Sequence, residues 1–141
     1  MTAAIRIAEP NDADAIARLL VELGYRVTSA SIGKTLAAMQ SDRDPVFVAT
    51  SKGTVVGMVA LNVTRWIQLE KPIARIPAMI VQEDHQRRGI GRRLIEHVVN
   101  HARQLGCGAV ELTSANDRSD AHAFYREIGF EQTSLRFKRS L

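Results

Sequence analysis

The sequence feature that most constrains the fold is a change of apolar period near residue 90. The run "IARIPAMIV" (73–81) is mostly apolar, which predicts a strand buried on both faces. From Gly91 onward the apolar residues recur at helical spacing, and the helix is expected to end at Gly106 and Gly108. The members of this stripe are Leu94, Ile95, Val98, Val99, Ala102 and Leu105. Because "AVELTS" (109–114) is the next predicted strand, these segments indicate a strand–helix–strand crossover over 74–114.

The other elements are predicted from turn residues and apolar spacing. Residues 4–8 form a short strand. A helix follows the turn at 10–12, with Ile16, Leu19, Leu20 and Leu23 at helical spacing and a stop at Gly24, and a second short helix is expected around 31–40. A hairpin over 45–63 turns at "SKGT". Residues 117–129 form a helix that ends at Gly129, and a strand closes the chain.

These elements predict one domain over residues 1–141 with an α/β fold. The expected order is β-α-α-β-β-β-α-β-α-β, with a mixed central sheet and helices on both of its faces. Pro77 has no N–H to donate inside its strand, so a bulge or an unpaired edge is expected there.

Composition sets limits on partners and compartment. The 141 residues carry a net charge of +4, which allows an anionic partner without identifying one. Cys107 is the only cysteine, so the chain forms no intramolecular disulfide and no Cys-rich metal site. The N-terminal segment meets an arginine and a glutamate too early for a signal peptide, and no apolar run approaches membrane-spanning length. A cytoplasmic protein that binds no membrane is expected.

The segment "HQRRGIGRRL" (85–94) places four arginines and two glycines at the start of the long helix. Cations are disfavoured at a helix N-terminus, so this crowding favours a bound anion such as phosphate or pyrophosphate. A solvated charged patch is the alternative. A dinucleotide fingerprint is excluded because Leu94 occupies the third glycine position. A P-loop is excluded because no lysine follows Gly91.

Two segments together resemble the GCN5-related N-acetyltransferases. Gln86-x-x-Gly89-x-Gly91 after a strand is similar to the pyrophosphate loop of that family, and "AHAFYREIGFEQ" (121–132) is similar to a second family segment downstream. The two segments span residues 79–132, and the elements on either side follow the family's order.

The resemblance implies roles for individual residues. Met79, Ile80 and Val81 would lie on the strand that pairs with the pantetheine arm of acetyl-CoA and polarises the thioester carbonyl. Asn116 would contact the same arm, and Tyr125 would protonate the leaving thiolate. The pyrophosphate would lie on the loop residues Gln86, Arg87, Arg88, Gly89, Ile90, Gly91 and Arg92.

The implied reaction is direct attack of a neutral amine on the thioester through a tetrahedral intermediate, whose oxyanion a backbone amide stabilises. Many family members place an acidic base just before the Met79 position, where this chain has Ala78. Glu111 is the replacement candidate. A glutamate at a solvated strand end and a water chain remain alternatives. Cys107 is interpreted as structural.

The histidines are not predicted to bind metal. His97 and His101 are four residues apart on one helix, a spacing that can hold zinc, but the pattern H-E-x-x-H is absent and both are expected to be solvated. His122 lies one helical turn from Tyr125 and is a candidate for the acceptor pocket.

The end of the chain (120–141) is similar to the aminoalkylphosphonate N-acetyltransferases, which share its D-A-H-x-F-Y core. A small primary amine, in particular an anionic one, is therefore the expected acceptor. Four arginines outside the loop are candidates to bind it: Arg65, Arg75, Arg118 and Arg136. The resemblance also implies a homodimer that contacts its partner through the C-terminal strand.

Three alternatives stay open at this point. The acceptor could be a protein N-terminus or a lysine. The domain could hold acyl-CoA without turnover. A nucleic-acid binder using "QRRGIGRR" as a basic patch is the third, although no nucleic-acid partner is the expectation.

Overall fold

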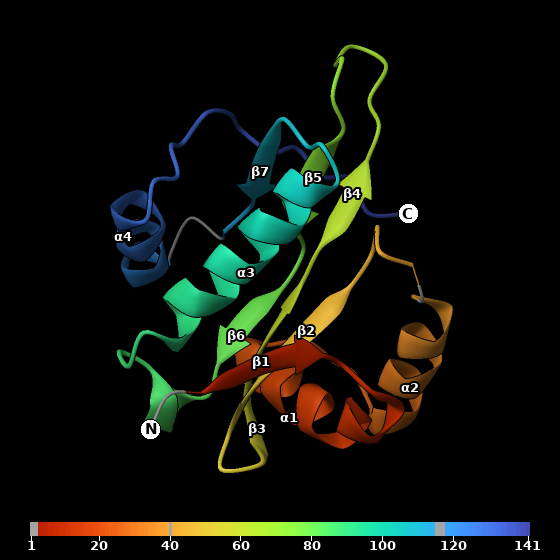
Figure 1. Ribbon diagram of the computed structural model, residues 1–141, viewed down its shortest axis with the longest axis vertical. Coiled ribbons are helices and arrows are strands. Elements are labelled where there is room, and N and C mark those ends of the chain that lie inside the picture. The colour runs from red at the N-terminus through yellow and green to blue at the C-terminus, as the bar shows by residue number, and fades with distance from the viewer. Residues whose placement is uncertain (1–2, 40, 115–117) are drawn as a thin grey trace.

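The computed structural model describes residues 3–39, 41–114 and 118–141 (Figure 1). One sheet has the strand order β1-β2-β3-β6 and is antiparallel throughout. The second has the order β4-β5-β7. The strands are β1 (Ala4–Ile7), β2 (Val46–Ser51), β3 (Thr54–Ala60), β4 (Asn62–Thr64), β5 (Ile73–Ile76), β6 (Met79–Val81) and β7 (Ala109–Leu112). The α-helices are α1 (Ala13–Leu23), α2 (Ser29–Ala38), α3 (Ile90–Gln104) and α4 (Ser119–Glu127), with short 3-10 turns at Pro10–Asp12 and Glu83–His85.

The predicted crossover is confirmed. Strands β5 and β7 are parallel neighbours with Ala74 opposite Val110, and α3 connects them. The predicted hairpin turn is confirmed as well. Lys52 (φ 52°) and Gly53 (φ 80°) both have positive φ, which matches the right-handed twist of the strands on either side.

The strand predicted over 73–81 is interrupted at Pro77 into β5 and β6. The Ala60 N–H donates to the Ala78 carbonyl (2.9 Å), whereas Asn62 lies opposite Arg75. Between these two contacts one segment advances two residues, from 60 to 62, while the opposite segment spans three, from 75 to 78. This extra residue is a β-bulge. The single mixed sheet of the prediction is thus divided into two sheets at this bulge.

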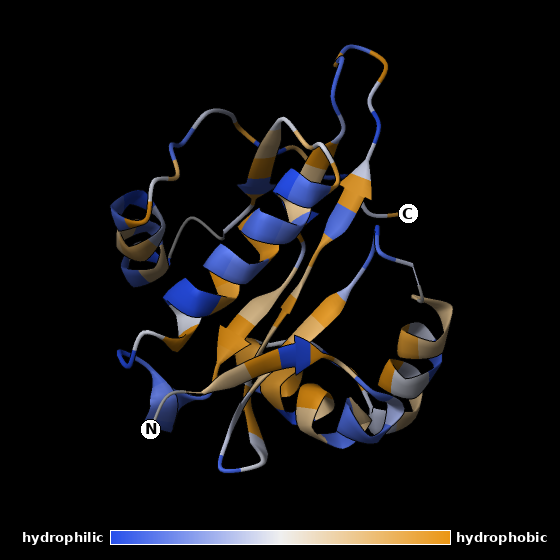
Figure 2. Ribbon diagram, in the orientation of Figure 1, coloured by the Kyte–Doolittle hydropathy of each residue, from blue (hydrophilic) through white to orange (hydrophobic). Residues whose placement is uncertain are grey.

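Helices cover both faces of the four-stranded sheet, as predicted. Helices α1 and α2 enclose one apolar cluster, centred on Ile16, Val48 and Met58. Helix α3 packs on the opposite face through Leu94 and Val98, both fully buried. Figure 2 shows the apolar side of α3 turned toward the strands and its polar side turned outward.

The predicted C-terminal strand is wrong. Helix α4 ends at Glu127, and residues 130–141 form neither strand nor helix. An alternating pattern produces a strand only where a partner strand lies in register, and here Leu135 and Phe137 remain 77% and 89% exposed. The Arg136 guanidinium donates to Thr113 Oγ1 at 3.4 Å. The homodimer contact through this segment stays a prediction.

No helix within the described residues is long and apolar enough to span a membrane.

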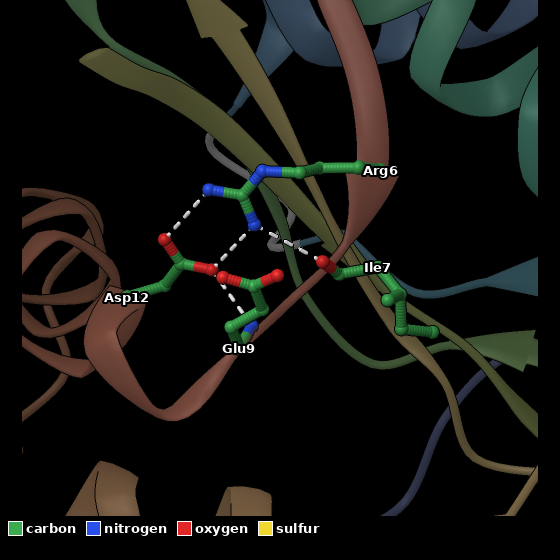
Figure 3. A network of polar contacts seen from close by, with 4 residues as sticks. All are labelled: Arg6, Ile7, Glu9 and Asp12. Carbon is green, nitrogen blue, oxygen red and sulfur yellow. Dashed lines mark hydrogen bonds and ion pairs between the residues drawn. The ribbon is translucent and has the colours of Figure 1, made fainter. Parts of the chain in front are cut away.

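A charged pair joins β1 to the start of α1 (Figure 3). Asp12 is only 6% exposed, and its two carboxylate oxygens accept from both terminal nitrogens of Arg6 at 2.7 and 2.9 Å. The Glu9 N–H donates to the same carboxylate at 2.7 Å. The hydrogen bonds from Arg6, then that from Glu9, hold the pKa of Asp12 below its usual value, against the opposing effect of burial.

Replacing Arg6 with alanine should destabilise the protein by about 2–3 kcal/mol, because it leaves the buried Asp12 carboxylate without its main partner. Urea unfolding of both proteins measures this change. The lowered pKa of Asp12 means that the stabilisation is present above the unfolded pKa near ~3.9 and is lost as pH falls through the folded value. The difference in unfolding free energy between the two proteins should therefore shrink as the pH is lowered from 6 to 2.

Arg18→Ala is the matched control, because Arg18 is an exposed arginine on α1. It should change the free energy of unfolding by less than about 0.5 kcal/mol. Equal losses for Arg6→Ala and Arg18→Ala would contradict a specific role for the pair.

Candidate functional site

Strand β6 presents unpaired backbone groups along one edge. Its ladder to β3 uses the Ala78 carbonyl and the Gln82 N–H, which bond to Ala60 (2.9 Å) and Val56 (2.7 Å). Backbone groups alternate in direction along a strand, so those of Met79 and Val81 point away from β3. No other described strand pairs with this edge. A ligand that carries amides could therefore continue the sheet here.

Ile80 differs from its two neighbours. It lies opposite Met58 in the ladder, and its side chain is buried in the cluster under α1 and α2. The structure thus gives Ile80 a packing role, and the cofactor contact expected of it stays a prediction.

The loop from β6 to α3 has a backbone suited to an anion. Gln86 Nε2 donates to the outward carbonyl of Val81 (3.0 Å), which ties the loop to the strand. Arg87 (φ 64°) and Gly89 (φ 80°) both adopt the left-handed region, on either side of Arg88. Such alternation directs successive N–H groups toward one side and forms an anion-binding concavity. The strained backbone of Arg87 was not predicted from the sequence.

The N-terminus of α3 adds free amides. The first helical bond runs from the Arg93 N–H to the Gly89 carbonyl (3.1 Å), so the amides of Ile90, Gly91 and Arg92 have no partner within the helix. Ile90 itself is buried and anchors this end to the core.

The four arginines of the segment are not equivalent. Arg93 donates to the carbonyl of Ala3 and is structural. Arg92 lies 3.7 Å from Glu127 of α4. Arg87 and Arg88 are exposed and bond to no described residue, which leaves both guanidinium groups available for a ligand.

Helix α4 packs against the start of α3 at Gly91. A Cβ on Gly91 would lie 3.4 Å from the Phe124 ring and 3.8 Å from Val81. The sequence predicted that the ligand would contact Gly91. In the structure the space beside its Cα is filled by the Phe124 ring. The packing fixes the position of the next residue, Tyr125, whose ring also contacts Phe130 at a centroid distance of 6.0 Å.

Tyr125 has the properties of a proton donor. Burial raises the pKa of its hydroxyl, and nearby Arg118 opposes this only in part. The hydroxyl therefore stays protonated beyond the pH range in which a thiol with a pKa near ~8.5 titrates.

Glu111 and Arg75 form an ion pair across β5 and β7. The two residues are opposite each other, with Arg75 Nη1 2.5 Å from Glu111 Oε1. The proposed base and one of the arginines expected to bind the acceptor are thus engaged with each other. Asn116 lies outside the described residues.

The histidines on α3 are half-buried, with one side of each ring packed against Phe47 and the rest open to solvent, so the prediction of solvated histidines holds only in part. The rings of His97 and His101 lie 4.4 and 5.6 Å from that of Phe47. His101 Nε2 donates to the Asp42 carbonyl (2.6 Å). Burial, with a smaller effect of His101, lowers the pKa of His97. The described residues contain no group of three side chains suited to a metal ion.

Cys107 is half-buried against the α3 side of the core, and burial raises the pKa of its thiol. It has the character of a packing residue.

A pocket of about 360 Å³ lies on the other face of the sheet, between α1, α2 and strands β2 and β3. At one end it reaches Pro77 and Ala78, the bulge residues that immediately precede β6. Sequence reasoning did not locate this pocket, because its walls come from segments far apart in the chain.

Comparison with known proteins identifies the family. Residues 10–130 match the model of the Acetyltransferase (GNAT) family, and the chain belongs to that family. It is 29% identical over 139 residues to the aminoalkylphosphonate N-acetyltransferase of Salmonella typhimurium, covering 97% of this chain and 90% of that protein. It is 35% identical over 99 residues to the uncharacterized N-acetyltransferase MJ1207 of Methanocaldococcus jannaschii, covering 69% of this chain but only 43% of that protein.

The fold is also found in a solved structure. A transcriptional regulator from Bacillus halodurans C-125 superposes with a TM-score of 0.91 at 21% identity, over 99% of both chains. At this identity the likeness concerns the fold alone.

Replacing Gly89 with alanine should cost about 1 kcal/mol of unfolding free energy, because its φ of 80° is unfavourable for any residue with a Cβ. Gly33→Ala is the matched control. Gly33 lies inside α2 with open space around it, so that change should stabilise by about 0.5–1 kcal/mol. Thermal unfolding measures whether each variant is less or more stable than the parent protein. Stabilisation by Gly89→Ala would contradict the loop geometry.

Proposed function

We propose that this protein transfers an acetyl group from acetyl-CoA to a primary amine, that of a small molecule. The observation that carries the proposal is the continuity of the outward edge of β6 with the anion-binding loop that follows it. Met79 offers its backbone N–H and carbonyl to an amide-bearing arm, and Val81 offers its N–H, because its carbonyl accepts from Gln86. The α3 N-terminus offers amides to a pyrophosphate.

The described residues fit an acyl-CoA molecule in charge as well as in hydrogen bonding. Arg87 and Arg88 are exposed cations beside the free amides of α3. Two buried side-chain atoms lack a partner among the described residues, His85 Nδ1 in the loop and Ser114 Oγ just after β7. Buried polar atoms are normally hydrogen-bonded, so neither atom is satisfied by the contacts among the described residues.

Met79, Tyr125 and Glu111 each have a role in the proposed reaction. The nitrogen lone pair of a neutral amine attacks the thioester carbonyl carbon, and the outward Met79 N–H donates to the oxygen as it becomes negative. The C–S bond then breaks, and the Tyr125 hydroxyl gives its proton to the departing sulfur. The amine loses one proton in the same sequence. Glu111 is the candidate acceptor for it, through the carboxylate oxygen that Arg75 does not hold.

The relatives and the pocket favour a small acceptor. The Salmonella protein that matches almost the whole chain is described as acting on aminoalkylphosphonates. The 360 Å³ pocket beside the bulge is at the lower end of the range for small-molecule sites, about 300–1,000 Å³. A protein N-terminus or a lysine as acceptor remains the alternative.

Arg88→Ala should weaken acetyl-CoA binding about tenfold, because it removes a cation from the proposed pyrophosphate site. Arg103→Ala removes the same charge from the opposite end of α3 and is the control. Isothermal titration calorimetry with acetyl-CoA measures both, and equal losses would indicate a general charge effect in place of a site.

Tyr125→Phe should lower kcat about 10- to 100-fold and leave acetyl-CoA affinity nearly unchanged, because it removes only the proton donor. The rate of CoA release with a saturating amine is the measurement. Because the pKa of Tyr125 is raised above 10, no loss of rate attributable to its ionisation is expected up to pH 9. An unchanged kcat would remove Tyr125 as the acid.

A further inference from the structure

The pocket beside the bulge has an apolar interior. Its walls are formed by aliphatic and thioether side chains from both helices and from the sheet, among them Leu20, Leu36, Met39 and Met58. Ala78 stands at its inner end, next to the strand that carries the proposed oxyanion donor. A ligand in this pocket therefore buries mainly hydrocarbon, and its reactive end has access to β6.

The pocket has few polar lining residues, and the one charge among those described is negative. Thr35, Asp44 and Asn62 are the polar lining residues, and Asp44 is the only charged one among the described residues of the lining. Asp44 Oδ1 accepts from the Ser41 N–H (3.1 Å) and from Ser41 Oγ (2.9 Å), which holds the carboxylate in place. The pocket thus offers a fixed negative charge at its wall.

None of the arginines expected to bind an anionic acceptor lines this pocket. Arg75 is paired with Glu111, and Arg136 donates to Thr113. Arg65 and Arg118 are also absent from the lining. A phosphonate placed here would lie near Asp44 with no cation to offset the repulsion and the loss of hydration.

We propose that the acceptor is a primary amine with a compact apolar body, which enters the pocket as an ammonium ion attracted by Asp44 and loses one proton to solvent water before it attacks as the neutral amine. Aminoalkylphosphonates are then poor substrates. This inference rests on the proposed acetyl transfer, and it concerns only the chemistry of the acceptor.

The first test compares kcat/KM for isoamylamine and for 2-aminoethylphosphonate at saturating acetyl-CoA. The apolar amine should be favoured at least tenfold, because only it replaces water on the hydrocarbon walls without placing an anion near Asp44. Preference for the phosphonate would overturn the inference and leave acetyl transfer itself intact. No transfer to either amine would count against the proposed function.

Variants test the pocket directly. Thr35→Trp places a large ring at the mouth and should raise KM for isoamylamine at least tenfold. Ala37→Trp, on the same helix but outside the lining, should not. Asp44→Asn should also raise KM about tenfold, whereas Asp42→Asn makes the same charge change outside the pocket. Equal effects within either pair would overturn the assignment.

A binding measurement separates the pocket from the reaction. With methyl-¹³C methionine, isoamylamine should shift the Met39 and Met58 resonances and leave Met79, which is outside the lining, unchanged. These shifts without any acetyl transfer would support the pocket and reject the proposed function. Unshifted Met39 and Met58 methyls at saturating amine would reject the pocket.

Discussion

Pro77 cannot donate a hydrogen bond to a neighbouring strand, and the sheet changes its register by one residue where Pro77 stands. On one side of it, β5 pairs with β7 in parallel. On the other side, β6 continues the antiparallel sheet and has no strand partner on its outer edge among the described residues. The division of the sheet into two follows from this bulge, and the division leaves the backbone groups of Met79 and the N–H of Val81 without a strand partner.

The same bulge lies between the proposed donor site and the proposed acceptor pocket. Ala78, one residue further on, lines the apolar pocket on the α1–α2 face. After the three residues of β6, the chain enters the loop in which Arg87 and Gly89 have positive φ, and α3 begins at the end of that loop. In the proposed reaction, a donor on the loop and the edge of β6 and an acceptor in the pocket would approach the same short strand from two sides, which is the geometry that direct transfer requires.

Features with a local signal could be predicted from the sequence. The apolar stripe of α3 and the turn at Lys52–Gly53 depend on near neighbours, and both were predicted correctly. An anion-binding role for the loop over 86–92 was predicted from its glycine spacing and stays a prediction, although the left-handed backbone at Arg87 and Gly89 is compatible with it. Features that depend on distant contacts were missed: Arg93 bonds to Ala3, 90 residues away, and Asp44 reaches the pocket from a loop with ordinary turn composition. The C-terminal strand was wrong for the same reason, because its alternating pattern does not specify a partner.

The central claim is that the β6 edge and the α3 N-terminus together hold acyl-CoA. The most direct test is the thermal unfolding midpoint with acetyl-CoA, with ATP and NADPH as anionic controls. At about 100 times its Kd, a ligand specific for the folded protein adds ~2.7 kcal/mol of stability, which raises the midpoint by several degrees. A rise with acetyl-CoA alone is the expected result. Equal rises with all three ligands, or none with acetyl-CoA, would contradict the claim.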